Sequence, residues 1–198
     1  EDPSYGPDEV LVEIHATALN RADLLQRAGG YPPPPGAPDI IGLEMAGVIS
    51  AIGSHVRHWQ VGARVCALLG GGGYAEKVAV HQSQLIPIPP EWSFEEAAAL
   101  PETYLTAFVN LFIEARLQPG ETVLVHGGAS GVGTAAIQIL HNLGHKVIVT
   151  AGSDEKVEAC RKLGADLAIN YRNEDFSEAV QAFTQDQGVD VILDMVGA

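Results

Sequence analysis

The sequence has few cysteines and no long hydrophobic run. Cys66 and Cys160 are the only cysteines among 198 residues, and two thiols so far apart do not make a disulfide framework. No apolar run approaches the roughly 20 residues that a membrane-spanning helix needs. These absences exclude a disulfide-stapled secreted domain. They favour a soluble protein in a reducing compartment, the cytoplasm.

Basic residues are also scarce. Lys plus Arg number 11 against 25 for Asp plus Glu, which gives a formal net charge of −14. A surface this acidic repels nucleic-acid backbones and anionic lipid, so we expect a small-molecule partner and neither nucleic acid nor membrane. An anionic ligand would need a local site that overcomes this field. The length and the 46% share of hydrophobic residues suffice for a buried core and exclude a disordered chain.

The first half of the sequence, up to about Pro101, reads as short strands separated by turns. Gly and Pro clusters at 29–30, 32–35 and 70–73 interrupt it, a pattern typical of an antiparallel barrel or sandwich. Helical spacing appears once, over 20–27. The clearest strands are expected at 10–16, 46–52, 64–69 and 74–80.

From about Glu102 onward, expected strands alternate with expected helices. Gly144 and Gly164 stand where helices end, at a position that favours glycine because the backbone turns left-handed there. Such alternation with short connections predicts a parallel, doubly wound sheet, and hence two domains, 1–101 and 102–198. Helices are expected at 105–115, 132–143, 154–163 and 176–184, and strands at 122–126, 146–150, 168–171 and from 190 onward.

The two ends of the sequence indicate a piece of a longer protein. The chain opens at Glu1 without a methionine, and nothing there resembles a targeting peptide. It closes in an apolar run after Asp190 that reads as a buried strand, and a parallel strand needs neighbours on both sides. We therefore expect that parts of the protein lie outside this sequence.

A glycine-rich segment, 126–133, stands between an expected strand and an expected helix. The dinucleotide-binding pattern G-x-G-x-x-G is met at Gly128 and Gly133, while Ser130 occupies the middle glycine position. In such a loop the backbone turns tightly, approaches a pyrophosphate and offers it the N–H groups of a helix N-terminus. No Lys-Ser/Thr pair follows, so the segment is not a P-loop. We predict a dinucleotide site formed by Gly128, Ser130, Gly131, Val132 and Gly133.

The residues after the next strand bear on which dinucleotide binds. NAD-binding domains usually place an acidic residue at the end of this strand, whereas here it runs into Ala151, Gly152 and Ser153. Ser153 and Lys156 could bind the 2′-phosphate of NADP. Against this, Asp154 and Glu155 are nearby, although both also suit the first turn of a helix, and Ser153 could be a simple N-cap. We favour NADPH as the cofactor.

Several segments, taken together, carry a family resemblance. They are 18–23 (ALNRAD), 30–34 (GYPPP), 42–47 (GLEMAG), the glycine loop 128–133, and 169–176 (INYRNEDF). With these segments the chain resembles the zinc-independent quinone oxidoreductases related to zeta-crystallin, in the medium-chain dehydrogenase/reductase superfamily, and looks nearest to their tumour-suppressor-inducible branch. The resemblance implies a GroES-like β-rich catalytic domain, a Rossmann domain and a homodimer. It also implies that an initial strand and a C-terminal part are absent here.

Zinc is not expected. The alcohol dehydrogenases of this superfamily have a zinc-binding Cys where this chain has Asn20, and a His where it has Leu43. Leucine has no lone pair for a metal and asparagine is a poor zinc ligand, while two isolated cysteines cannot build a four-cysteine structural site. The seven histidines show no HxxxH or HExxH grouping.

Without a metal to polarise a carbonyl, hydride transfer suits an acceptor that is already electron-poor, such as a quinone or an alkene conjugated to a carbonyl. The resemblance implies that Asn20, Asp23 and Tyr31 line the substrate pocket. It also implies that Thr106 is the threonine on the nicotinamide side and that Tyr171 flanks the adenosine phosphate.

Each of these residues also has a purely structural interpretation. Asn20 could be an N-cap, and Asp23 a first-turn charge on the same helix. Tyr31 could pack on the following prolines, Thr106 could be a buried helical threonine, and Tyr171 could pack at a sheet edge.

The leading interpretation is a zinc-independent, NADPH-dependent quinone reductase. One alternative is a 2-alkenal or enoyl reductase on the same scaffold. Another is a non-catalytic cofactor-binding protein, as in lens crystallins derived from such enzymes.

Overall fold

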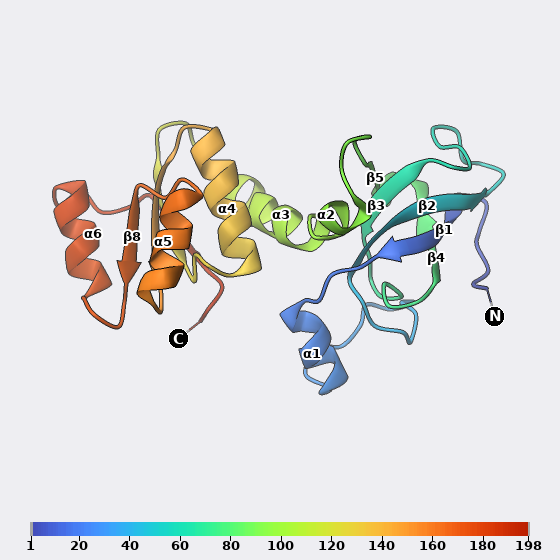
Figure 1. Ribbon diagram of the computed structural model, residues 1–198, viewed down its shortest axis with the longest axis horizontal. Coiled ribbons are helices and arrows are strands. Elements are labelled where there is room, and N and C mark those ends of the chain that lie inside the picture. The colour runs from blue at the N-terminus through green and yellow to red at the C-terminus, as the bar shows by residue number, and fades with distance from the viewer. Residues whose placement is uncertain (1, 198) are drawn as a thin grey trace. The chain divides into compact units, whose positions relative to one another are not determined.

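The computed structural model describes residues 2–197 of the chain. The chain divides into two compact units, one that ends at Glu102 and one that begins at Thr103. The first unit contains an antiparallel sheet and the second a parallel sheet (Figure 1). The expected fold class, a GroES-like β-rich unit followed by a Rossmann-like α/β unit, is confirmed.

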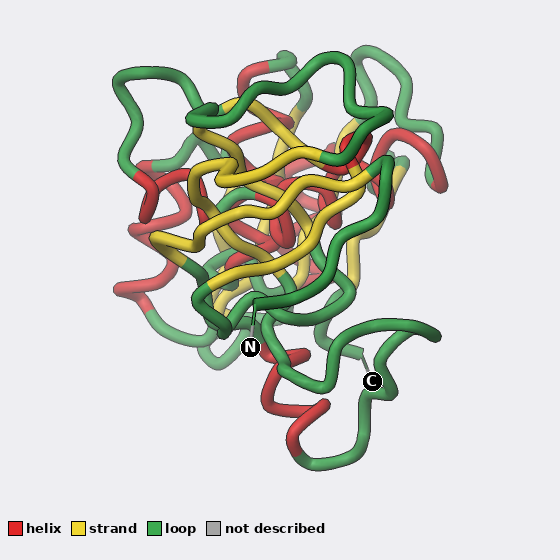
Figure 2. Tube along the Cα trace, turned by 90° about the vertical axis from the view of Figure 1, so that its right-hand side faces the viewer, coloured by secondary structure: helices red, strands yellow, loops and turns green. Residues whose placement is uncertain are grey.

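The first unit is built on a five-stranded sheet in the order β4-β1-β2-β3-β5, with antiparallel neighbours throughout. Figure 2 looks at this unit and shows the strands, in yellow, as a curled sheet with long loops at its ends. One core cluster gathers Val10, Val12, Met45 and Ile49 from two neighbouring strands. The strands are β1 (Glu9–Ala16), β2 (Glu44–Ile52), β3 (Arg64–Leu68), β4 (Lys77–His81) and β5 (Leu85–Pro87).

Some expectations for this unit were wrong in detail. The strand expected at 74–80 begins only at Lys77, because the backbone N–H groups of Tyr74 and Ala75 bond to Ile41 and Gly72 in a turn. A single curled sheet replaces the barrel or sandwich. The sequence interpretation also missed β5, a 3₁₀ turn (Gln82–Gln84) and α2 (Phe94–Ala98), which are too short to give a hydrophobic period.

The second unit has a parallel sheet in the order β8-β7-β6-β9. The strands are β6 (Thr122–His126), β7 (Lys146–Ala151), β8 (Leu167–Asn170) and β9 (Val191–Asp194). The chain moves outward from β6 to β8 and then crosses to the other side of β6. Ligands bind sheets of this kind at the carboxyl ends of the strands, where the order reverses, which is here between β6 and β9.

Helices cover both faces of this sheet. Val123 and Val125 on β6 face a cluster that includes residues of α4 (Gly131–Asn142) and α5 (Asp154–Lys162), whereas Leu124 faces Val180 of α6 (Phe176–Thr184). Figure 1 accordingly shows α5 and α6 on opposite sides of β8. Strands buried on both faces are continuously apolar, and such runs are a strong sequence signal for a parallel sheet.

The helix expected at 105–115 differs from what is observed. It begins earlier, as α3 (Pro101–Phe108), because proline suits the first turn of a helix. It continues as a π-helical turn over Val109–Glu114, where the N–H of Ala115 donates to Asn110 O at 2.9 Å. Within residues 2–197, no helix combines the length and the apolar character that crossing a membrane requires.

The pairing of β1 with β2 gives the first prediction, at Gly47, which lies opposite Ile14. A Cβ at Gly47 would overlap the carbonyl oxygen of Glu13, a backbone atom that cannot move without disturbing the ladder. We expect Gly47→Ala to lower the free energy of unfolding by about 1–3 kcal/mol, measured by urea titration. Gly30→Ala is the control, because its Cβ would come no closer than 3.7 Å to any neighbour. Equal stability of the two variants would contradict the prediction.

Candidate functional site

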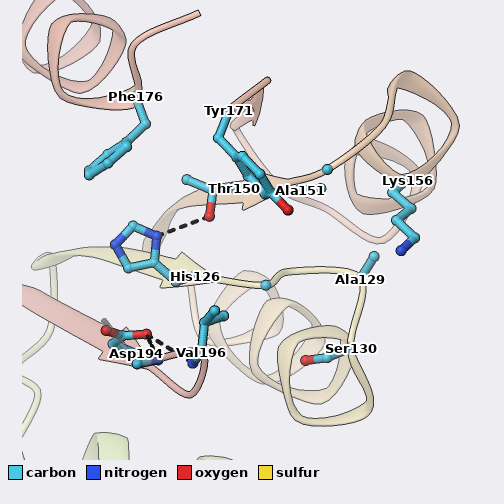
Figure 3. A pocket seen from close by; sticks show the side chains of 13 residues that line it. His126, Ala129, Ser130, Thr150, Ala151, Lys156, Tyr171, Phe176, Asp194 and Val196 are labelled. Atoms are coloured by element: carbon cyan, nitrogen blue, oxygen red, sulfur yellow. Dashed lines mark hydrogen bonds between the residues drawn. The ribbon is translucent and has the colours of Figure 1, made fainter. Parts of the chain in front are cut away.

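A cavity of about 700 Å³ opens at the carboxyl ends of the parallel strands in the second unit. Its walls come from the end of β6 and the glycine loop after it, the end of β7 and the start of α5, and the residues that follow β8 and β9. Figure 3 shows these segments converging on one space. The cavity therefore lies where the strand order of the sheet predicts a ligand.

The glycine loop at this cavity has no room for side chains. The N–H of Gly128 donates to the carbonyl of Thr150 on β7 at 2.9 Å, which holds the loop against the neighbouring strand. A Cβ at Gly128 would lie 2.7 Å from Cβ of Val149, and one at Gly133 would lie 2.7 Å from the carbonyl oxygen of Gly128. Gly127 has a φ of 69°, in the left-handed region. Glycine at 128 lets the loop pack closely against Val149 of β7, and glycine at 133 lets α4 pack directly on the backbone of the loop.

This packing fixes the start of α4. Ser130 is the N-cap of the helix, and its Oγ accepts a hydrogen bond from the N–H of Gly133 at 3.1 Å. Within the described part of the chain, the N–H groups of Gly131 and Val132 have no acceptor. Free N–H groups and the positive end of a 12-residue helix are the features that favour an anion at a helix N-terminus.

One edge of the cavity is formed by Lys156 and Tyr171. Lys156 has no ion-pair partner among the described residues, and Figure 3 shows its side chain on the same side of the cavity as Ala129. The hydroxyl of Tyr171 lies 2.6 Å from the place that a Cβ at Gly152 would take, so its phenol ring covers the backbone there. Ser153 is the N-cap of α5, and its Oγ accepts from the N–H of Lys156 at 3.4 Å.

The opposite edge of the cavity holds residues that the sequence interpretation missed. The Nδ1 atom of His126 lies 3.0 Å from Oγ1 of Thr150, and its ring meets that of Phe176 edge-on at 5.0 Å (Figure 3). Asp194 accepts from the N–H groups of Val196 and Gly197 at 2.9 and 3.1 Å, and these bonds lower the pKa of its carboxyl. His126, Thr150 and Asp194 lie at or beside the ends of β6, β7 and β9. That position is the one signal in the sequence that could have identified them as site residues.

The eight residues expected at the cofactor site fall into three groups. Ser130, Lys156 and Tyr171 line the cavity. Gly128, Gly131, Val132 and Gly133 form the loop and the start of α4 behind it, and Ser153 caps α5.

A second group of polar side chains is buried in the first unit. Asp23 on α1 (Arg21–Arg27) is 2% exposed and Glu44 at the start of β2 is 1% exposed. One carboxylate oxygen of Asp23 accepts from the backbone N–H of Asn20 at 2.7 Å and from the hydroxyl of Tyr74 at 2.8 Å. Glu44 accepts from the carboxamide of Asn20 at 2.7 Å and from the N–H of Glu102 at 2.8 Å. Two buried carboxylates are thus linked through one asparagine.

Burial raises the pKa of Glu44, of Glu102 beside it and of Tyr74. Desolvation raises the pKa of Glu44, and the nearby carboxylate of Asp23 adds to the rise. The pKa of Glu102 is raised by burial and by Glu44. Burial, and then the hydrogen bond to Asp23, raise the pKa of Tyr74 to about 12. The other oxygen of Asp23, Oδ1, is buried and has no partner among the described residues.

The structure brings together only some of the residues expected on the substrate side. Asn20 stands at the N-cap position of α1 and donates to Asp23 and Glu44, and Tyr74 joins this group through its bond to Asp23. Tyr31 is 42% exposed in the loop after α1. Thr106 lies on α3 of the second unit, where its carbonyl accepts from the side chain of Asn110 at 2.8 Å. Glu44 lies within 42–47, one of the segments that carry the family resemblance, whereas no sequence pattern pointed to Tyr74.

In residues 2–197, no three His, Cys, Asp or Glu side chains come together in a way that would hold a metal ion. Cys66 and Cys160 are buried free thiols, and burial raises the pKa of both. The expected independence of zinc stays a prediction.

Comparison with protein families assigns both units. Residues 6–90 match the alcohol dehydrogenase GroES-like domain, and residues 131–198 match the family described as zinc-binding dehydrogenase. Together these matches cover most of the two units.

Individual relatives span nearly the whole chain. The human synaptic vesicle membrane protein VAT-1 homolog is 37% identical over 195 residues, 98% of this chain and 49% of its own length. Quinone oxidoreductase of Escherichia coli, solved in complex with NADPH, has 36% identity and a TM-score of 0.89 over 99% of this chain and 60% of its own. The CurK enoyl reductase has 36% identity and a TM-score of 0.91 over 100% of this chain and 62% of its own.

The chain therefore spans about half the length of the curated relative and about three-fifths of the two solved chains. The narrower placement in the tumour-suppressor-inducible branch stays a prediction. The two matched families, the strand order and the whole-chain likeness to quinone oxidoreductases agree, and the chain belongs to the medium-chain dehydrogenase/reductase superfamily.

Proposed function

We propose that this chain provides the NADPH site and part of the substrate site of an oxidoreductase that reduces quinones. The observation that carries the proposal is the N-terminus of α4. Among the described residues the N–H groups of Gly131 and Val132 have no acceptor, and this helix end lies directly behind the Ala129 and Ser130 wall of a cavity of about 700 Å³. A helix end of this kind binds the diphosphate of a dinucleotide.

The residues at the cavity fit such a cofactor. A side chain at Gly133 would meet the loop carbonyls and displace the start of α4, and one at Gly128 would push the loop away from Val149 on β7. Gly131 and Val132 would hold the diphosphate through their N–H groups. Bound NADPH supplies the hydride.

The choice of NADPH over NADH rests on the Lys156 edge of the cavity. A 2′-phosphate carries about two negative charges and needs cations or N–H and O–H donors. Lys156, the hydroxyl of Tyr171 and the hydroxyl of Ser153 offer all of these. No carboxylate ends β7, because that strand closes on Ala151. The solved complex of the E. coli relative with NADPH supports the same choice.

On the substrate side we propose roles that follow from the buried polar group. Asn20 and Tyr31 are the hydrogen-bond donors for the acceptor oxygen. The carboxamide nitrogen of Asn20 uses one hydrogen on Glu44 and keeps the other. Asp23 and Glu44 are too buried to meet a substrate and serve as positioning residues for Asn20. Thr106 remains the proposed contact on the nicotinamide side.

These donors determine the class of acceptor. Asn20 and Tyr31 are neutral, so they stabilise a developing oxyanion less than a cation would. An acceptor that is already electron-poor, such as a quinone, compensates for that weakness. An enoyl or 2-alkenal reductase is the second candidate, favoured by the 36% identity with the CurK enoyl reductase. The homodimer and the cytoplasmic location are further proposals, and a non-catalytic cofactor-binding protein is the alternative if no turnover is found.

The reaction itself is tested by following NADPH oxidation with an ortho-quinone and, in parallel, with a trans-2-enal. We expect turnover with the quinone and a loss of about 10–100-fold in kcat/KM for Asn20→Ala, because one charge-stabilising hydrogen bond is removed. Activity with the enal alone would favour the second candidate. Binding of NADPH with no turnover of either acceptor would favour the non-catalytic alternative.

The cofactor choice is tested by titration with NADPH and NADH. Lys156→Ala should raise the Kd for NADPH about 10–100-fold and leave that for NADH within about twofold, because only NADPH carries the phosphate that Lys156 would bind. The control is Lys162→Ala on the same helix, whose ammonium lies 3.8 Å from Glu158. Equal Kd values of the unchanged protein for the two cofactors would contradict the choice.

The buried carboxyl of Glu44 predicts a pH dependence of stability. Because the pKa of Glu44 is raised in the folded state, the folded chain binds more protons than the unfolded chain above pH 4.5. The free energy of unfolding should therefore fall as the pH rises from 4.5 to the raised pKa, and the fall should be smaller in Glu44→Gln. Urea titrations at several pH values measure the slope, with Glu95→Gln correcting for one lost exposed charge. An unchanged slope in Glu44→Gln would refute this assignment.

A further inference from the structure

We propose that Asn170 is a specificity-determining residue, which makes the cofactor site selective for NADPH by restraining the carboxylate of Asp154. The inference rests on the proposed function, since it concerns the same cavity. It assigns a role to two residues that line neither the glycine loop nor the cavity wall.

Asp154 is one of two carboxylates, with Glu155, in the first turn of α5 that would oppose a phosphate beside Lys156. It follows the N-cap Ser153 and precedes Lys156 by two positions in the first turn of α5. A carboxylate free to turn there would repel the 2′-phosphate and would compete with it for the ammonium of Lys156. The chain needs either to remove this charge or to hold it away from the ligand.

The hydrogen bonds of Asp154 hold its carboxylate away from the place proposed for the 2′-phosphate. Its Oδ1 accepts a hydrogen bond from the side-chain amide of Asn170 at 2.6 Å and a longer one from the amide of Asn173 at 3.4 Å. Asn170 is the last residue of β8, pairs with Ala151 of β7 and is 8% exposed. A buried donor at the end of β8 therefore directs the carboxylate toward the loop after that strand.

The same asparagine also orders the loop that carries Tyr171. Its Oδ1 accepts from the N–H of Arg172 at 3.2 Å, and its backbone carbonyl accepts from the N–H of Asn173 at 2.9 Å. Tyr171 lies between these contacts, and its own N–H donates to Ala151 at 3.2 Å. Both halves of the Asn170 carboxamide are thus used, one on α5 and one on the Tyr171 loop.

This double use explains why asparagine suits the position. Aspartate would set a second carboxylate against Asp154, and leucine would lose both bonds. If Asn170 had a purely structural role, its replacement would weaken the binding of both cofactors alike. A residue that restrains a charge beside the phosphate affects NADPH far more than NADH.

The test is a set of cofactor titrations that follows the Asp154 charge. Asn170→Ala should raise the Kd for NADPH about tenfold and leave the Kd for NADH within about threefold, because the carboxylate is released. Adding Asp154→Asn to that variant should recover most of the lost NADPH affinity. Asn173→Ala is the control, since it removes only the 3.4 Å contact, and should change the Kd for NADPH less than threefold.

Two outcomes overturn the inference. One is an equal loss of NADPH and NADH affinity in Asn170→Ala, and the other is no recovery on adding Asp154→Asn; either makes Asn170 a structural residue only. If Asn170→Ala does not fold, the exchanged pair Asp154→Asn with Asn170→Asp keeps a hydrogen bond between the two side chains and moves the charge away. That variant should bind NADPH at least as tightly as the unchanged protein, and weaker binding would overturn the inference.

Failure of this inference and failure of the proposed function give different results. If the unchanged protein does not prefer NADPH over NADH, the proposed cofactor is wrong. If it prefers NADPH and Asn170→Ala keeps the full preference, only the role of Asn170 is wrong.

Discussion

The direct backbone packing of the loop between β6 and α4 is the constraint on which the proposed site depends. The N–H of Gly128 bonds to Thr150 on β7, and Gly133 packs against the carbonyls of the loop itself. Because neither glycine adds a side chain of its own, the loop packs closely on both β7 and α4, and the start of α4 is fixed at the carboxyl end of the sheet. Its free N–H groups, and the cavity beside them, follow from that placement.

A recurring device in both units is an asparagine that restrains a carboxylate. In the first unit the carboxamide of Asn20 donates to Glu44, and in the second that of Asn170 donates to Asp154. A chain with a net charge of −14 that binds an anion must manage its carboxylates locally. Amide donors do this without adding a charge, because they set the direction of a carboxylate rather than cancel it.

The sequence predicted the fold well because the strongest signals are local. Buried strands such as 122–126 are continuously apolar, and the helices near Gly144 and Gly164 end at glycines with φ of 80° and 111°. The site was harder to predict, because its contacts join distant residues. Tyr74 lies 51 positions from Asp23 and Asn170 lies 16 positions from Asp154, so neither pair has a sequence pattern. The sequence likewise places Asp154 beside Lys156 but gives no sign of the asparagine that bonds to its carboxylate.

The most direct test of the account is a crystal structure of the protein with NADPH bound. The account predicts the diphosphate against the N–H groups of Gly131 and Val132, and the 2′-phosphate beside Lys156 and Tyr171. Asp154 should still be hydrogen-bonded to Asn170 in that complex. A diphosphate bound away from the start of α4, or a 2′-phosphate that turns away from Lys156, would contradict it.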